Sequence, residues 1–190
     1  MSILENRRFN YADYITWDDK ERYELIDGIV YAMASPSQAH QEVSREISGQ
    51  LWQFLRGKPC KLFTAPFDVR LNAESLDDKV VQPDLLVVCD KSKLDGKSVV
   101  GAPDMIIEIL SSSNAGNKRH DKVTKFRLYQ KAGVREYWII DPESYTADVY
   151  ILENGKYIAN LYNDEDIVPV HVLEGCEINL ADVFDDLTEE

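Results

Sequence analysis

Two short apolar runs, each with one acidic residue, constrain the fold of this chain most. The first run, Leu85–Val88, directly follows Asp84, and the second, Met105–Leu110, contains Glu108. Apolar runs of this length are typical of strands that are buried on both faces. A carboxylate inside such a strand is unfavourable unless it is paired or binds a metal ion. The sequence therefore predicts a buried sheet that carries two candidate functional acids.

Helix and strand patterns alternate around these runs. Asp27-Gly28 between two apolar segments predicts a hairpin, and the four-residue apolar period over Ser37–Leu55 predicts an amphipathic helix. A second helix is predicted over 118–132, with Gly133 as its C-cap, and a short helix is expected to start at Thr16. Strands are predicted at Lys61–Leu71, Asp84–Asp90, Asp104–Leu110, Arg135–Asp141, Ala147–Glu153 and Lys156–Tyr162. This order favours an α/β (α+β) fold with a mixed central sheet flanked by helices.

Length and composition narrow the class of protein. The 190 residues suit one domain, residues 1–190, with an acidic segment from about residue 160. No apolar run reaches the roughly 20 residues that cross a bilayer, and the N-terminus lacks signal-peptide features. The three cysteines, Cys60, Cys89 and Cys176, are odd in number and lack CxxC spacing. We therefore expect no disulfide framework, no zinc ribbon, and a reducing, cytoplasmic compartment.

The net charge of −13 opposes binding to nucleic acid, because affinity for phosphates comes from Lys and Arg. The charge is unevenly distributed, however. Residues 118–135 carry seven basic residues and one acidic residue, whereas residues 160–190 carry ten acidic residues and no Lys or Arg. Either both stretches are ordinary solvated surfaces, or the basic stretch lies along the rim of the active site as the route by which a polyanion approaches. In the second case the acidic residues from Asp164 onward are expected to face away from the site.

The helix after Glu108 carries the third candidate group. Asp121, Lys125 and Tyr129 are spaced by four residues and are expected to share one face. Val123 and Phe126 mark an adjoining apolar stripe that would dock on the sheet. Lys125 then lies beside the buried stripe, where it either extends to solvent and pairs with Asp121 or reaches the two acids.

Three segments in this order resemble a known family. They are Gln82-Pro83-Asp84, Glu108-Ile109-Leu110-Ser111, and the stretch from Asp121 to Asp141 that contains Lys125, Tyr129, Gly133 and Tyr137-Trp138. The chain resembles the widespread Uma-type restriction endonuclease family of the PD-(D/E)xK nuclease superfamily. Tyr23–Gly28 and the stretch from Ser35-Pro36 to His40 resemble it too, so the resemblance covers roughly Tyr11 to Pro142. It implies a restriction-endonuclease-like core and an endonuclease that hydrolyses the phosphodiester bonds of DNA.

The resemblance also implies roles for individual residues. Asp84 and Glu108 are expected to bind Mg²⁺, or Mn²⁺ in its place, and to be catalytic together with a lysine. The superfamily usually has that lysine two positions after the second acid, where this chain has Leu110, so we assign the role to Lys125. The family also tends to have Ser-Pro-Ser after this acid, where this chain has Ser111-Ser112-Ser113.

Four further residues are candidate accessory groups. Glu24 would add a metal or water contact, and His40 would either touch substrate or brace its helix; the other two are Asp121 and Tyr129. The Ile109 carbonyl is a candidate third metal ligand. Without metal, Glu108 is expected to be an uncompensated buried carboxylate, so Glu108→Ala should be neutral or stabilising.

Two other functions remain open at this point. The first is a catalytically silent nuclease fold that serves as an interaction module, with the acidic C-terminal segment as one contact surface. The second is a different phosphate or metal hydrolase, which is disfavoured because the sequence contains no P-loop, GxSxG or HExxH motif. A homodimer would suit cleavage of both strands of a duplex, although no residue demands one.

Overall fold

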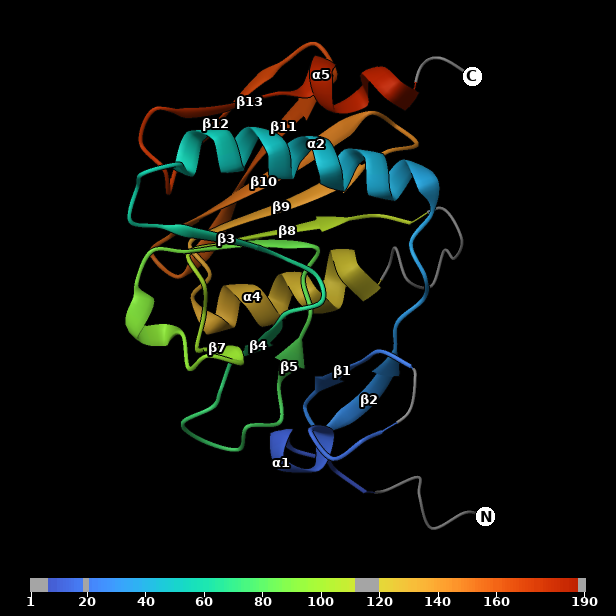
Figure 1. Ribbon diagram of the computed structural model, residues 1–190, viewed down its shortest axis with the longest axis vertical. Helices are drawn as coiled ribbons and strands as arrows, with labels where there is room; N and C mark the ends of the chain where they lie inside the picture. Colours follow the sequence, from blue (N-terminus) through green and yellow to red (C-terminus); the bar gives the residue numbers. More distant parts are fainter. Residues whose placement is uncertain (1–6, 19–20, 112–119, 188–190) are drawn as a thin grey trace.

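A six-stranded mixed sheet forms the centre of the computed structural model, which describes residues 7–18, 21–111 and 120–187 and only the backbone at 120–122 (Figure 1). Its strand order is β11-β10-β9-β8-β6-β3. The strands are β3 (Lys61–Thr64), β6 (Leu85–Val88), β8 (Met105–Ile109), β9 (Glu136–Asp141), β10 (Thr146–Glu153) and β11 (Lys156–Asn163). β8 and β9 run parallel and the other neighbours antiparallel, so the predicted mixed α/β architecture is confirmed.

The two faces of this sheet pack against different layers (Figure 1). One face packs against α2 (Gln38–Leu55), α5 (Leu180–Phe184) and the hairpin of β12 (Ile167–Val170) and β13 (Cys176–Asn179). The other face packs against α4 (Phe126–Ala132). Leu85 and Val87 belong to the core with α2, whereas Leu86 and Val88 belong to the core with α4. Because strand residues alternate between faces, Glu108 of β8 points to the α4 side.

The helix α2 confirms the amphipathic helix that the four-residue apolar period predicted. Ser37 caps its N-terminus by accepting a hydrogen bond from the backbone N–H of His40 at 3.2 Å. Its buried apolar residues are Val43, Ile47, Leu51 and Leu55. His40 in the first turn is also buried, whereas Ala39, expected in the apolar stripe, is only half-buried. No described helix is both long enough and apolar enough to cross a membrane.

A second sheet lies beyond α4 and has the strand order β2-β1-β5-β4-β7 (Figure 1). Its strands are β1 (Tyr23–Ile26), β2 (Ile29–Ala32), β4 (Asp68–Arg70), β5 (Val80–Val81) and β7 (Ser98–Val100). The hairpin predicted at Asp27-Gly28 joins β1 and β2. Both turn residues have positive φ, 53° and 73°, as the tight turn of a twisted two-residue hairpin requires.

The single strand predicted at Lys61–Leu71 is wrong, because the segment forms two strands in different sheets. β3 ends at Thr64, a cis peptide bond joins Ala65 to Pro66, and β4 then belongs to the second sheet. Pro66 has no N–H to continue the ladder of β3. The Ala65 N–H instead donates to the Asp84 carbonyl at 2.9 Å, which brings this crossover next to a candidate acid.

The first helix also differs from the prediction. It is α1 (Tyr11–Tyr14), and its N-cap is Asn10. Asn10 and Asp13 form a complete capping box, in which each side chain accepts a hydrogen bond from the other's backbone N–H. Thr16 follows the helix and donates its hydroxyl to the Asp13 carbonyl. The helix starts after Asn10 and not at Thr16, because Asn10 and Asp13 form this complete reciprocal cap.

The sequence predicted no disulfide framework, but the structure contains a disulfide. Cys60 and Cys89 are bonded, and Cys176 is free and buried. Lys61 pairs with Val88 across β3 and β6, so the next residues outward on the two strands, Cys60 and Cys89, face each other. Spacing along the chain gives no sign of such a cross-strand neighbour. The number of cysteines therefore no longer supports a reducing compartment.

The helix predicted over 118–132 is irregular where the structure describes it. A π-helical turn, His120–Lys125, precedes α4, and Gly133 ends the helix with a φ of 88°, as predicted. The wider turn changes the side-chain period from that of an α-helix. Val123 is consequently 43% exposed instead of lying in the predicted apolar stripe, whereas Phe126 is partly buried against the α4-side core.

Candidate active site

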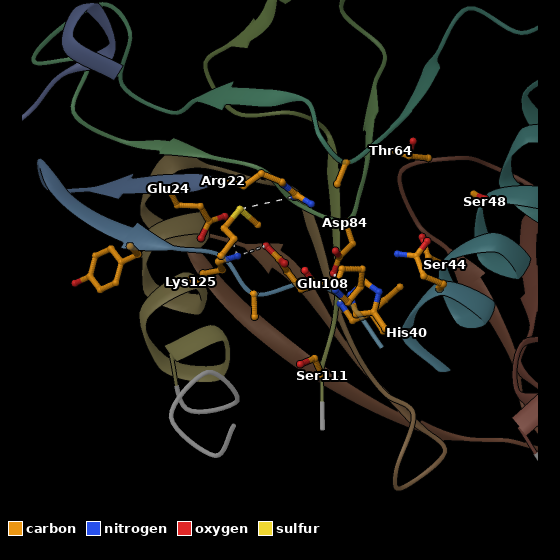
Figure 2. Close-up of a pocket in the computed structure, with 18 of the residues that line it drawn as sticks. Arg22, Glu24, His40, Ser44, Ser48, Thr64, Asp84, Glu108, Ser111 and Lys125 are labelled. Atoms are coloured by element: carbon orange, nitrogen blue, oxygen red, sulfur yellow. Dashed lines mark hydrogen bonds and ion pairs between the residues drawn. The ribbon is translucent and has the colours of Figure 1, made fainter. Parts of the chain in front are cut away.

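Five predicted site residues line one cavity of about 550 Å³ (Figure 2). They are Glu24 from β1, His40 from α2, Asp84 just before β6, Glu108 from β8, and Lys125 at the end of the π-helical turn. These elements belong to both sheets and to the helices that cover the central sheet. The fold therefore brings together residues that are widely separated along the chain.

Lys125 lies between two acids at the base of the cavity. Its Nζ atom is 3.0 Å from Glu108 Oε1 and 3.0 Å from Glu24 Oε1. Only 3% of Lys125, 5% of Glu108 and 4% of Glu24 is exposed. The lysine therefore reaches Glu108, one of the two acids of the second sequence reading, and its other carboxylate partner here is Glu24.

Tyr129 binds the same oxygen of Glu108 as Lys125 does. Its hydroxyl donates to Glu108 Oε1 at 2.6 Å, although Tyr129 itself does not line the cavity. Burial raises the pKa of Tyr129 well above its ordinary value, and the nearby charges of Glu108 and Glu24 act in the same direction. Tyr129 is therefore a protonated donor that orients Glu108. The side chain of Asp121, the other accessory candidate on this helix, lies outside the described residues.

Asp84 is held by a backbone group and by a histidine. Its Oδ2 atom accepts a hydrogen bond from the Ile109 N–H at 2.8 Å and lies 3.1 Å from His40 Nε2. His40 thus connects the first turn of α2 to the acid. Its other ring nitrogen, Nδ1, is buried and has no hydrogen-bond partner in the part of the chain that the structure describes.

Gln82 holds Glu24 and Arg22, two residues that line the cavity, a role that the sequence did not reveal. Its backbone N–H donates to Glu24 Oε1 at 3.0 Å. Its side-chain amide donates to Tyr14 and Asp68 and accepts from Arg22 Nε at 3.0 Å. The available signal in the sequence was a polar residue between the apolar pair Val80-Val81 and Pro83.

Among the residues that the structure describes, Lys125 is the one basic residue at the cavity that belongs to the predicted stretch. Of the basic stretch at 118–135, Lys125 lines the cavity, but Arg135 bonds Asp104 at 2.7 Å and does not line it. The side chains of Lys118, Arg119 and Lys122 lie outside the described residues. Arg22 and Arg45, which the sequence did not single out, also line the cavity.

One acidic residue of the C-terminal segment contradicts the expectation that this segment faces away from the cavity. Asp186, in the 3₁₀ turn Asp185–Leu187, forms an ion pair with Arg45. Because Arg45 lines the cavity, the acidic segment comes to its rim and neutralises one of its cations.

The donor set of the cavity suits a hard divalent cation. Among the described residues, no three side chains of His, Cys, Asp or Glu gather closely enough to hold a metal ion by themselves. Asp84 and Glu108 do line the same cavity, as does Ile109, whose carbonyl is a further oxygen donor. Mg²⁺ typically uses one or two protein carboxylates and completes its shell with water and substrate phosphates. The residues present therefore fit Mg²⁺ better than a metal that needs several protein ligands.

A family model and two further proteins match this chain in sequence. Residues 11–181 match the Uma2 family, described as "Putative restriction endonuclease". Two uncharacterized proteins of Synechocystis are similar in sequence. Protein slr1290 is 26% identical over 142 residues, which are 73% of this chain and 71% of that protein. Protein sll1609 is 27% identical over 155 residues, which are 79% of this chain and 84% of that protein.

A solved structure shares the fold. It is the crystal structure of a "putative nuclease belonging to DUF820" from Anabaena variabilis, with a TM-score of 0.74 and 19% sequence identity. The similarity covers 93% of this chain and 98% of that chain. At this identity the likeness concerns the fold, and it agrees with the expected restriction-endonuclease-like core. Because the family match covers most of the chain, this protein belongs to the Uma2 family of "putative restriction endonucleases".

Proposed function

We propose that this protein is a Mg²⁺-dependent endonuclease that hydrolyses phosphodiester bonds of DNA at Asp84, Glu108 and Lys125. The observation that carries the proposal is the buried Lys125 ammonium, 3.0 Å from Glu108 in a cavity that Asp84 also lines. Buried ionised groups are unfavourable unless they are paired, and clusters of them gather at functional sites. Membership of the Uma2 family supports nuclease activity in general.

The acids would hold the metal, and their neighbours would orient them. Asp84 and Glu108, with the Ile109 carbonyl, are the proposed ligands. Bound Mg²⁺ would polarise the scissile phosphate and make a bound water more acidic. The Ile109 N–H and His40 keep the Asp84 carboxylate in one orientation, and Tyr129 does the same for Glu108.

Lys125 is proposed to act on the reacting groups directly. Its ammonium, held 3.0 Å from Glu108 Oε1 and 3.0 Å from Glu24 Oε1, is the proposed donor to an attacking water or a phosphoryl oxygen. A fixed positive charge at this point would stabilise the negative charge that develops on the phosphoryl oxygens. Glu24 would position the lysine without binding the phosphate.

Plasmid cleavage tests the proposal. The wild type should nick or degrade plasmid DNA in Mg²⁺ or Mn²⁺, and EDTA should abolish the activity. Lys125→Ala should retain Mn²⁺ binding, measured by calorimetry, but lose about 10²–10³-fold in rate. Lys131→Ala, which removes an exposed lysine of the same helix, is the matched control.

The opposite results have distinct meanings. If Lys125→Ala cuts as fast as the wild type, the lysine assignment is wrong and Lys122 becomes the next candidate. If the wild type cuts neither DNA nor RNA with any divalent ion, the nuclease proposal fails. The remaining reading would then be a silent nuclease fold that acts as an interaction module.

A further inference from the structure

A second groove of about 560 Å³ adjoins the cavity. It is formed by α2, by β3 and by the residues that follow β3. Ser48 of α2 and Thr64 of β3 line both the groove and the cavity, and Figure 2 shows them on the α2 side of Asp84. The groove is therefore continuous with the candidate active site, and a strand that places a phosphate at Asp84 can extend into it.

The groove presents aromatic rings to solvent. Trp52 is 59% exposed and lines the groove together with Phe63 and Phe67. The two phenylalanine rings stack on each other, with centroids 4.5 Å apart and planes 13° apart. The guanidinium of Arg56 lies 5.1 Å from the Trp52 ring centroid. Phe63 and Phe67 are partly buried, so Trp52 is the exposed ring of the three. An exposed aromatic ring next to an arginine is a feature with which proteins stack the bases of single strands.

The charge along this face of α2 also suits a nucleic-acid strand. Gln41, Arg45, Ser48, Trp52 and Arg56 are spaced by three or four residues and so share one face of the helix, with no acidic residue among them. In a protein with a net charge of −13, this strip carries two arginines and no acid of its own, although Asp186 pairs with Arg45, and it is the surface that a phosphate backbone can approach.

We propose that this groove binds an unpaired nucleobase next to the scissile phosphate, so that the preferred substrate is DNA with an unpaired strand. The proposal rests on the proposed nuclease function. A base inside a duplex has both faces covered by its neighbours, so it can stack on Trp52 only when it is unstacked. Single-stranded DNA and duplexes with an unpaired segment offer such bases.

Gly49 provides a way to block the groove. It lies within α2 and lines the groove, and an added Cβ at this position would meet no atom within 4 Å. Glycine is also unfavourable in a helix, so a larger side chain should not destabilise α2. Gly49→Leu therefore fills the groove, and Trp52→Ala removes its most exposed ring.

Binding without cleavage tests the proposal. In EDTA, fluorescence anisotropy would compare a labelled 12-nucleotide oligothymidylate with a hairpin duplex. We expect the wild type to bind the single strand more tightly. Trp52→Ala and Gly49→Leu should weaken this binding by about tenfold or more. Trp52→Phe should keep most of it, and Leu161→Ala, which removes an exposed apolar side chain from β11, should have no effect. Circular dichroism would confirm that each variant is folded.

The groove proposal fails if the wild type does not bind the single strand, or if the folded groove variants bind it as tightly as the wild type. It also fails if those variants change their oligomeric state, because the occupant of the groove would then be a second copy of this chain. Plasmid and single-strand cleavage in Mg²⁺ separates this proposal from the endonuclease itself. Groove-dependent binding without any cleavage would support the groove and defeat the endonuclease. If the wild type cleaves DNA and the groove variants cleave it equally fast, the endonuclease proposal is supported and the groove proposal fails.

Discussion

At the scale of the residue, Glu108 is a compensated buried acid. Lys125 and Tyr129 both donate to its Oε1 atom. Glu108→Ala would leave the Tyr129 hydroxyl unpaired and take one of two carboxylates from Lys125. We therefore expect a loss of about 1–3 kcal/mol in the free energy of unfolding, measured by urea denaturation without metal.

This expectation reverses the one from the sequence alone, in which alanine is neutral or stabilising. Glu108→Gln, which keeps an acceptor for Tyr129 but removes the charge, should be destabilised less than Glu108→Ala. Both variants should lose metal-dependent cleavage. An alanine variant as stable as the wild type would show that the lysine and tyrosine do not compensate the carboxylate.

At the scale of the element, the disulfide between Cys60 and Cys89 joins the outer ends of β3 and β6 and closes a loop of the chain with a sequence separation of 29. A cross-link of this kind stabilises a protein mainly by restricting the unfolded chain, typically by about 2–4 kcal/mol. Cys60→Ser, or reduction of the wild type, should lower the unfolding free energy by this amount. Detection of three reactive thiols in the unreduced, denatured protein would contradict the bond.

The contact between the C-terminal 3₁₀ turn and α2 is a second prediction at this scale. Asp186→Asn should release Arg45 at the cavity rim. Affinity for a short DNA strand at low salt should rise, and the salt dependence of binding should steepen by about one counterion. Asp182→Asn removes an exposed charge from the neighbouring helix α5 and is the control. An equal effect of the two variants would point to net charge alone.

At the scale of the whole molecule, one buried and several half-buried tyrosines should limit stability in alkali. Burial is the main cause of raised pKa values at Tyr11, Tyr14, Tyr129, Tyr150 and Tyr157. In the unfolded chain these phenols ionise near pH 10, whereas in the fold they keep their protons. Unfolding therefore releases protons, and the stability is present below about pH 10 and is lost as the pH rises further.

Urea denaturation between pH 8 and 11 would measure this loss. For a fully buried group such as Tyr129, the expected slope is about 1.4 kcal/mol per pH unit above pH 10. Tyr129→Phe should reduce the slope of unfolding free energy against pH by about the contribution of Tyr129. The same variant also loses the hydrogen bond from Tyr129 to Glu108. A wild-type stability that does not change between pH 9 and 11 would contradict the prediction.

The sequence by itself determined the features that depend on near neighbours. The turn at Asp27-Gly28 follows from residues that tolerate positive φ, and the buried face of α2 follows from its four-residue period. Glu108 stood out because its strand neighbours are apolar. Lys125 stood out only through the family resemblance together with its place beside an apolar stripe, and that stripe is partly wrong at Val123.

Only the tertiary structure decided which of these pieces meet. No local pattern shows that the chain changes sheets after Thr64, that Cys60 faces Cys89, or that Asp186 reaches Arg45. The same holds for the groove, whose rings come from α2, from β3 and from the residues after it. Backbone sterics and side-chain period act over a few residues, whereas these contacts depend on how the sheets pair and how the helices pack on them.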